Sequence, residues 1–368
     1  MATHILLDSL EIKQFRAFEH LRISKLGRVN LIVGKNNVGK TSLLEALWLY
    51  AYQGAPNILW KILEGRDEGR GPVPIEPVKS EDVASIIKLL VHGRKNITRG
   101  ITPIEIGPIN SVDKTLSLTL SWFTSQRNEE GIRRLVSLPP DQYELVTDAI
   151  LGFEMKQGRK QSIYRIDTRA ARPQDSENNT CIFVAASGLS QTEVGRYWDG
   201  ISLTSLEDEV LESLRIIAPE VERVSLVGSR SLGPRSDRLP IVKIDSADDP
   251  VPLRSLGEGM NRLFGVALAL VNSRNGLFLI DEIESGLHYS VQHKVWELVF
   301  EVARRLNIQV FATTHSWDCI TAFQEAAKED EQDEGVLIRL VEKKGRIIAD
   351  LFDEGDLSVV SREGIEVR

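Results

Sequence analysis

The stretch from Val29 to Tyr50 constrains the fold of this chain more than any other. It consists of a short apolar run, VNLIV, then the glycine-bounded loop GKNNVGKT, then the apolar run SLLEALWLY. This order predicts a strand, a loop and a helix, and the loop matches the phosphate-binding pattern G-x-x-x-x-G-K-[ST], the Walker A motif. The chain is therefore expected to bind a nucleotide at this loop.

Each residue type in the loop has a mechanical reason. Gly34 and Gly39 let the backbone curl so that its N–H groups point inward, and a helix that begins near Thr41 directs its positive end toward phosphates. Lys40 is expected to reach the β- and γ-phosphates of ATP, and the Thr41 hydroxyl is expected to bind Mg²⁺. The alternative, a glycine-rich turn that binds nothing, is disfavoured by the flanking strand and helix. The predicted nucleotide-binding residues are Gly34, Lys35, Asn36, Asn37, Val38, Gly39, Lys40, Thr41 and Ser42.

The composition indicates a globular protein. A length of 368 residues allows one large domain or two ordinary ones, and a hydrophobic content of 42% is ample for a core. Cys181 and Cys319 fit no metal-ligand spacing, and no signal peptide or bilayer-spanning run is apparent, so we expect a cytoplasmic protein without membrane contact. A net charge of −8 disfavours a chain that is basic throughout. The locally basic residues 159–172 are either a DNA or partner surface or an ordinary solvated hairpin.

The N-terminal half is predicted to consist mostly of strands. Apolar and polar residues alternate or cluster in the segments that we expect to be strands: residues 10–13, 21–24, 115–124, 151–155, 162–166 and 181–185. The first two are expected to form an antiparallel β-subdomain ahead of the Walker A strand. Residues 54–113 are expected to be an insertion, with a loop or insertion at 54–71 and a short helix at 80–90.

The C-terminal half is predicted to contain more helix. Thr204 and Glu207 have the spacing of a capping box ahead of a helix of about four turns, and residues 189–238 are expected to form a helical arm or lid. Sustained heptads are absent, so a long coiled coil of the SMC type is not expected. The remaining expected elements are a strand at 241–244, a strand at 309–312, a helix after His315, an acidic loop at 325–334 and a hairpin of 336–341 with 347–352.

A second cluster of polar residues follows the apolar segment GLFLI at 276–280. Asp281 stands where a Walker B aspartate holds Mg²⁺, and Glu282 stands where a general base orients and deprotonates the attacking water. A solvated strand end is the alternative for this acidic pair, and the Walker A loop upstream disfavours it. His315 follows the next apolar strand, at the place where a γ-phosphate sensor is needed.

The order of these motifs resembles that of the ABC-type ATPases, specifically the OLD and RecF-like branch. The segments that carry the resemblance are the Walker A loop, SLGEG at 255–259 before a long apolar helix, the acidic pair at 281–282, ESGLH at 284–288 and TTHS at 313–316. The resemblance covers roughly residues 5 to 55 and 240 to 325. It implies an α/β fold with one P-loop NTPase domain over residues 1–368, an ABC-type ATPase head with an N-terminal antiparallel β-subdomain and helical insertions.

The resemblance also implies roles for further residues. The signature segment, which in this family contacts the γ-phosphate held by the partner subunit, corresponds to Ser255, Gly257, Glu258 and Gly259. A homodimer or higher homo-oligomer around ATP and Mg²⁺ is therefore implied. His315 corresponds to the switch histidine and residues 284–288 to the D-loop. The family's Q-loop glutamine has no clear counterpart, and Gln126 is the best candidate.

The resemblance implies a function and leaves alternatives open. Typical OLD proteins continue into a Toprim nuclease, and the residues after His315 are too few for such a domain. We therefore expect a stand-alone ATPase of the anti-phage defence type, a sensor or motor that acts with a separate Toprim-like nuclease or another effector. The alternative is an ATP-gated DNA clamp or scaffold in DNA maintenance, with incidental turnover. A membrane transporter subunit is a weaker alternative, because its heads usually carry LSGGQ where this chain has SLGEG.

Overall fold

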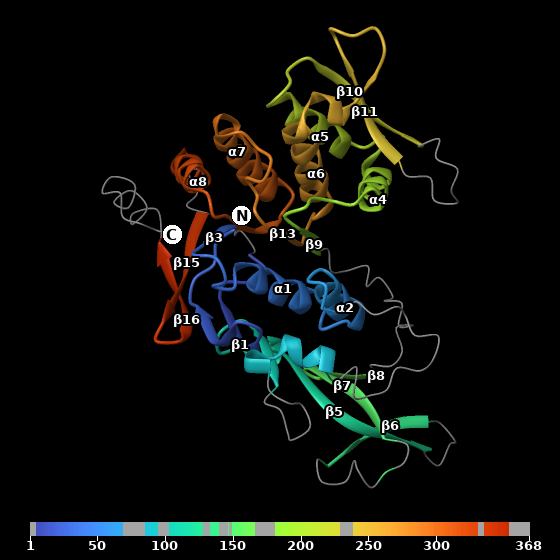
Figure 1. The fold of residues 1–368 in the computed structure, drawn as a ribbon, viewed down its shortest axis with the longest axis vertical. Coiled ribbons are helices and arrows are strands. Elements are labelled where there is room, and N and C mark those ends of the chain that lie inside the picture. The colour runs from blue at the N-terminus through green and yellow to red at the C-terminus, as the bar shows by residue number, and fades with distance from the viewer. Residues whose placement is uncertain are drawn as a thin grey trace.

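A six-stranded sheet lies at the centre of the computed structural model (Figure 1). The structure describes residues 5–68, 85–94, 103–127, 133–139, 146, 149–165, 181–228, 238–329 and 335–352. The sheet has the order β16-β15-β3-β14-β13-β9. Its strands are β3 (Val29–Val33), β9 (Cys181–Val184), β13 (Leu277–Ile280), β14 (Gln309–Thr313), β15 (Gly335–Lys343) and β16 (Arg346–Phe352). All neighbours are parallel except β16, which runs antiparallel to β15.

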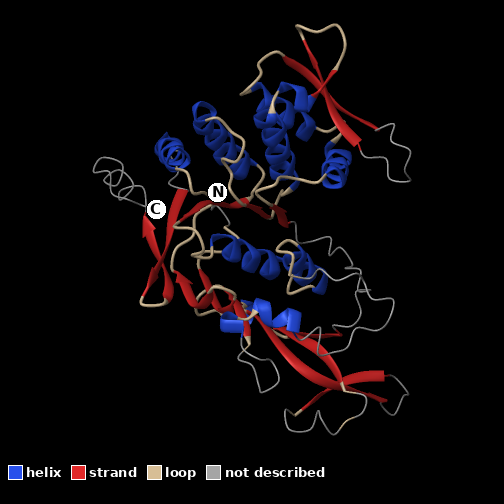
Figure 2. Ribbon diagram, in the orientation of Figure 1, coloured by secondary structure: helices blue, strands red, loops and turns tan. Residues whose placement is uncertain are grey.

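Helices cover both faces of this sheet (Figures 1 and 2). One face carries α6 (Glu258–Asn272), α7 (Tyr289–Arg305) and α8 (Trp317–Glu329), and the other carries α1 (Lys40–Ala51) and α2 (Pro56–Glu64). Because both faces are buried, the central strands read as nearly continuous apolar runs. The α/β class predicted from the sequence is confirmed.

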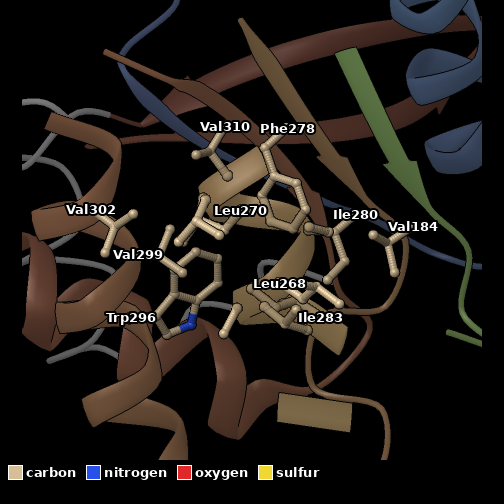
Figure 3. Close-up of a cluster of buried hydrophobic side chains, with 14 of the residues drawn as sticks. Val184, Leu268, Leu270, Phe278, Ile280, Ile283, Trp296, Val299, Val302 and Val310 are labelled. Carbon is tan, nitrogen blue, oxygen red and sulfur yellow. The ribbon is translucent and has the colours of Figure 1, made fainter. Parts of the chain in front are cut away.

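Side chains of β13 show how the two apolar layers are built. Phe278 and Ile280 belong to the cluster under α6 and α7, and Leu277 and Leu279 belong to the cluster under α1, as the two-residue period of a strand requires. Figure 3 shows the first cluster, in which the β13 side chains lie beside leucines of α6, and Trp296 of α7 belongs to the same cluster. The carboxyl end of β13 is thereby fixed on both sides.

A second, antiparallel sheet precedes and follows the Walker A loop in sequence. Its order is β2-β1-β4-β5-β7-β8, with β6 paired to β5. Its strands are β1 (Leu10–Phe15), β2 (Phe18–Ile23), β4 (Ile104–Gly107), β5 (Leu116–Arg127), β6 (Arg133–Leu138), β7 (Ile150–Gln157) and β8 (Lys160–Arg165). β2 packs against β16, and Arg346 forms an ion pair with Glu19 at 3.2 Å. The predicted N-terminal antiparallel β-subdomain is confirmed.

Residues 189–252 extend the layer of α6. They form α4 (Gln191–Ile201), α5 (Ser205–Arg215), β10 (Val221–Gly228), β11 (Arg238–Ile244) and β12 (Val251–Pro252). Trp198 of α4 and Leu214 of α5 join the same apolar cluster as α6 and β13. Movement of this segment as an arm or lid stays a prediction. Helices in the described ranges do not reach the combination of length and apolar character that a membrane span requires.

Short 3-10 turns complete the described elements: η1 (Lys88–Leu90), η2 (His92–Arg94), η4 (Val112–Lys114) and η6 (Leu253–Leu256). The helix expected at 80–90 is seen only in part, because residues 85–87 are helical, η1 follows, and residues 80–84 lie outside the described ranges. Residues 166–172 of the basic segment also lie outside them.

Three local predictions need correction. A loop was expected within residues 54–71, but residues 56–64 form the helix α2. Pro56 starts this helix, and its apolar residues are buried on one side: Ile58, Leu59, Ile62 and Leu63. The acidic run begins inside α8, since its first five residues are helical. Helix α5 has 11 residues, fewer than four turns, and the Glu207 carboxylate accepts the N–H of Leu203 instead of that of Thr204.

Candidate nucleotide-binding site

The Walker A loop joins β3 to α1 and is fixed by two glycines. Gly34 has φ +144° and Gly39 has φ +92°, conformations that favour glycine. A Cβ at Gly34 would lie 2.5 Å from the backbone oxygen of Leu340, and a Cβ at Gly39 would lie 2.9 Å from Cζ of Phe18. Other residues at these positions would displace β15 or the β1–β2 turn, so the loop is held closely against both.

The middle of the loop is open to solvent. Lys35, Asn36 and Asn37 are exposed, whereas Val38 is buried. Asn37 has φ +67°, a left-handed conformation that asparagine tolerates better than most residues. Val38 therefore anchors the loop while its polar part remains accessible to a ligand.

Lys40 starts α1 and folds back over the loop. Its Nζ donates to the backbone oxygen of Gly34 at 2.7 Å and of Lys35 at 3.2 Å. Burial lowers the pKa of Lys40, and the negative charges of the carboxylates after β13 oppose this effect. A half-buried ammonium whose hydrogen bonds within the described ranges go to two carbonyl groups is suited to receive an anion such as phosphate.

Asp281 lies where three elements meet. Its Oδ2 accepts a hydrogen bond from the Thr41 hydroxyl at 2.9 Å, and its Oδ1 accepts one from the Thr313 hydroxyl at 2.5 Å. A hydroxyl and a carboxylate side by side are hard oxygen ligands of the kind that Mg²⁺ takes together with phosphate oxygens. The residues present therefore fit the implied metal.

Glu282 has an unusual backbone conformation, with φ +49°. Its N–H donates to the Thr313 hydroxyl at 2.9 Å. Non-glycine residues held in the left-handed region are strained and occur preferentially at functional sites. The side chain is 42% exposed, and it lines the same pocket as Lys40 and Thr41. Its carboxylate can therefore reach a water molecule in that pocket.

His315 follows β14 and lies beside two carboxylates. Its Nδ1 is 3.2 Å from Oε1 of Glu284 and 3.7 Å from Oε1 of Glu282. Its backbone N–H also donates to Oε1 of Glu284 at 3.1 Å. Glu284 is only 8% exposed, so it acts as a fixed acceptor that holds His315 next to Glu282.

A pocket of about 760 Å³ brings the Walker A residues and the acidic pair together, whereas Thr313, Glu284 and His315 are not among the described residues that line it. The predicted site residues among those that line it are Asn36, Asn37, Gly39, Lys40, Thr41, Ser42, Asp281 and Glu282. Among the described residues of the lining, none comes from the signature segment 255–259. The structure therefore groups Walker A with the acidic pair and leaves the signature elsewhere.

The wall of the pocket contains charged residues that the sequence analysis missed. Arg16 pairs with Glu45 at 2.7 Å and with Glu68 at 2.9 Å, and Arg66 pairs with Glu45 at 2.7 Å. Burial raises the pKa of the Glu45 carboxyl, and the two arginines oppose this effect. Arg66 also donates to the Ser42 hydroxyl at 3.2 Å. These residues form no motif: Arg16 lies in the β1–β2 turn, Glu45 lies in α1, and the return of the chain after α2 brings Arg66 and Glu68 to them.

The signature residues lie at the N-terminus of α6. Ser255, Gly257 and Glu258 are exposed. Gly257 has φ +107°, and a Cβ built there would meet no atom within 4 Å. At Gly259 a Cβ would lie 2.9 Å from the backbone oxygen of Gly286, so this glycine permits the close approach of α6 to the turn after β13.

Two other predicted residues lie away from the pocket. Gln126 is exposed on β5, opposite Arg134 of β6, and is not among the described residues that line the nucleotide pocket. The structure gives no support for it as the Q-loop glutamine. His288 is the N-cap of α7, where its Nδ1 accepts the N–H of Ser290 at 3.4 Å.

Two family models match separate parts of the chain. A model named AAA ATPase domain matches residues 6–99, and an AAA domain model whose description names the AbiEii toxin and a type IV toxin–antitoxin system matches residues 196–318. The first match contains the Walker A loop. The second contains the signature segment and the acidic pair.

Individual proteins are similar to the chain over different lengths. An ATP/GTP phosphatase from Helicobacter pylori is 24% identical over 357 residues, which are 89% of this chain and 90% of that protein. The DNA replication and repair protein RecF from Bacillus mycoides is 40% identical over 45 residues, 12% of each chain. The Smc head domain from Pyrococcus furiosus, bound to the C-terminal domain of ScpA, has a TM-score of 0.49 and 11% identity over 97% of this chain and 98% of that chain.

Proposed function

We propose that this ATPase, an α/β P-loop protein with AAA-type domains, binds ATP between two copies of the chain and uses slow hydrolysis as a switch that controls a separate effector. The observation that carries the proposal is the separation of two phosphate-binding parts. Lys40, Thr41 and the acidic pair share one pocket, whereas the signature residues are exposed at another place on the surface. A site that uses both parts therefore needs a second copy.

The N-terminus of α6 is suited to a phosphate that comes from outside the chain. Ser255 supplies a hydroxyl, and the open space at Gly257 allows a close approach to its backbone. The helix adds partial positive charge at the same point. A γ-phosphate held by Lys40 of one copy can then be contacted by Ser255 and Gly257 of the other.

The chemistry is assigned to residues of the nucleotide pocket and to two residues beside it, Thr313 and His315. Glu282 accepts the proton of the attacking water, while Thr313 holds its backbone N–H. Lys40 exchanges its two carbonyl partners for phosphate oxygens. His315, 3.7 Å from the Glu282 carboxylate, senses the γ-phosphate. Mg²⁺ held by Thr41 and Asp281 would neutralise charge that develops on the phosphates.

The biological role that we propose is anti-phage defence in the cytoplasm, with a Toprim-like nuclease or another protein as the effector. The match to a model that names a toxin–antitoxin system supports this role. The alternative is an ATP-gated clamp on DNA, which the short match to RecF supports. ATPase activity stimulated by duplex DNA would favour the clamp, and stimulation by a phage protein alone would favour the sensor.

The dimer is tested with a variant that binds ATP and hydrolyses it slowly. Glu282→Gln keeps the size of the side chain and cannot accept the proton, so hydrolysis should slow by about 10²–10⁴-fold. This variant should accumulate as an ATP-dependent dimer, or as a larger assembly of such dimers, measured by light scattering with and without Mg-ATP. Adding Gly257→Trp should prevent the assembly by blocking the approach to the signature backbone.

A matched control is available for the added tryptophan. Gly345, in the β15–β16 turn, also has a positive φ, +77°, and open space around a built Cβ. Glu282→Gln with Gly345→Trp should therefore assemble with ATP as the parent does. An unchanged mass with and without ATP, or a Gly257→Trp protein that assembles as well as its control, would contradict the proposal.

A further inference from the structure

Arg262 connects the signature helix to the strand that carries the acidic pair. It lies four residues after Glu258, one turn into α6, and is only 7% exposed. Its two terminal nitrogens donate to three backbone oxygens at 3.0 Å each, those of Ala185, Asp281 and Glu282. These oxygens belong to the first residue after β9 and to the first two residues after β13, and the two strands are parallel neighbours. Arg262 therefore links the carboxyl ends of β9 and β13, and the acidic pair that lines the nucleotide pocket follows β13.

A buried arginine at this place is costly. Burial lowers the pKa of Arg262, and the nearby carboxylates, Glu284 first, oppose this effect. Within the described residues, Nε of Arg262 has no hydrogen-bond acceptor. An apolar side chain of similar length would avoid both the burial of a charge and the buried N–H without an acceptor. The three hydrogen bonds to carbonyl groups explain why an arginine is present at this buried position.

Glu282 is held from two sides. Its N–H donates to the Thr313 hydroxyl at 2.9 Å, and its carbonyl oxygen accepts from Arg262 at 3.0 Å. Between these two hydrogen bonds the residue has φ +49°, a conformation that a glutamate keeps only when its surroundings impose it. The direction of the Glu282 side chain depends on this backbone conformation.

We infer that Arg262 is a positioning residue, which holds the backbone of Glu282 so that its carboxylate faces the attacking water. The inference rests on the proposed function, in which Glu282 is the general base. Arg262 acts through Glu282 and not on the phosphates. The helix that presents the signature to a second copy therefore also fixes the general base of its own copy.

Two substitutions test the inference. Arg262→Met removes the donors and keeps most of the apolar length. Arg262→Lys keeps the charge and loses the planar fork that reaches three carbonyl groups. The matched control is Arg274→Met, at an exposed arginine just after α6. For each protein we would measure kcat and KM for ATP, the affinity for AMP-PNP with Mg²⁺, and the melting temperature.

The expected result separates positioning from binding. Arg262→Met should lower kcat by about 10–100-fold, as the loss of a group that orients a catalytic residue does. KM and AMP-PNP affinity should stay at the wild-type values. Arg262→Lys should have an intermediate kcat, and Arg274→Met should match the wild type. Under single-turnover conditions, the double variant Arg262→Met with Glu282→Gln should hydrolyse ATP at the same rate as Glu282→Gln alone. The carboxylate that Arg262 positions is already absent in both proteins.

Several results would overturn the inference. One is a kcat for Arg262→Met equal to that of its control, Arg274→Met. Another is a single-turnover rate of the double variant that is lower than that of Glu282→Gln by the full factor that Arg262→Met causes alone. If Arg262→Met does not fold, Arg262→Lys decides, and a wild-type kcat for this variant overturns the inference. By contrast, a wild-type protein that turns over no ATP, or a Glu282→Gln protein as fast as the wild type, would overturn the proposed function.

Discussion

Individual residues at the site fall into those that a motif names and those that support them. That Lys40, Thr41 and Asp281 lie together in one pocket could be predicted from the sequence, because phosphate and Mg²⁺ chemistry restricts residue types at fixed positions, and their roles as ligands stay a prediction. Thr313 and Arg262 could not be predicted as supports. They act on backbone groups or side chains of residues 19 to 77 positions away, and this contact depends on which strands are neighbours.

Lys40 provides a test at this scale. Lys40→Ala should abolish ATP binding without unfolding the protein, because among the described residues the ammonium donates to two loop carbonyls and the side chain is only partly buried. Isothermal titration with Mg-ATP and a thermal melt measure the two properties. Lys25→Ala, at an exposed lysine outside the loop, is the control and should bind as the wild type does. Unchanged affinity in Lys40→Ala would contradict the assignment of the loop.

Whole elements were predictable where the local pattern agrees with the burial. The strand expected at 115–124 became β5, and the hairpin expected at 336–352 became β15 and β16. Prediction failed at α2, where flanking glycines and charges obscured a short amphipathic helix. It also placed the capping box at Thr204, whereas the complete box is formed by Ser190 and Glu193 at α4, since spacing alone does not say which N–H a carboxylate accepts.

The cap of α4 provides a test at the scale of one element. The Ser190 hydroxyl accepts the N–H of Glu193 at 3.3 Å, and the Glu193 carboxylate accepts the N–H of Ser190 at 2.9 Å. Ser190→Ala should lower the free energy of unfolding by about 1 kcal/mol, measured by urea denaturation. Ser246→Ala, at an exposed serine in a turn, should have little effect. Equal stability of both variants would mean that the cap contributes nothing.

At the scale of the molecule, the topology was the least predictable feature. Strand β3 lies between β14 and β15, and β9 forms the far edge of the sheet. Each of these strands has an apolar pattern that identifies it as buried, but no local pattern says which buried strands pair. The position of the antiparallel sheet against β16 is likewise set by contacts between distant segments.

The two cysteines report on the integrity of the whole fold. Cys181 of β9 and Cys319 of α8 are free and buried, and burial raises the pKa of both thiols, that of Cys319 to about 12. Because the thiolate is the reactive form, neither should react with DTNB at neutral pH until the protein unfolds. Mg-ATP should slow the labelling further by stabilising the folded state.

The control for this labelling is Lys40→Ala, whose rate should not respond to ATP. Fast labelling of the native wild-type protein would show that β9 or α8 opens without global unfolding. An equal effect of ATP on both proteins would place the nucleotide outside the Walker A loop.

The neighbours of β3 have a consequence for how the protein is made. Asn30 of β3 donates through its side chain to the backbone oxygen of Val310, 280 residues further along the chain. At ribosomal rates of about 5–20 residues per second, β3 waits on the order of 15–60 s for β14 to be synthesised. Until then one of the most apolar segments of the chain has neither neighbour in the sheet, and Asp281 lacks the hydrogen bond from Thr313 that holds it beside the loop. We therefore expect a nascent chain to complete its nucleotide pocket only after β14 has been made, and a polypeptide that ends before residue 309 to lack this pocket.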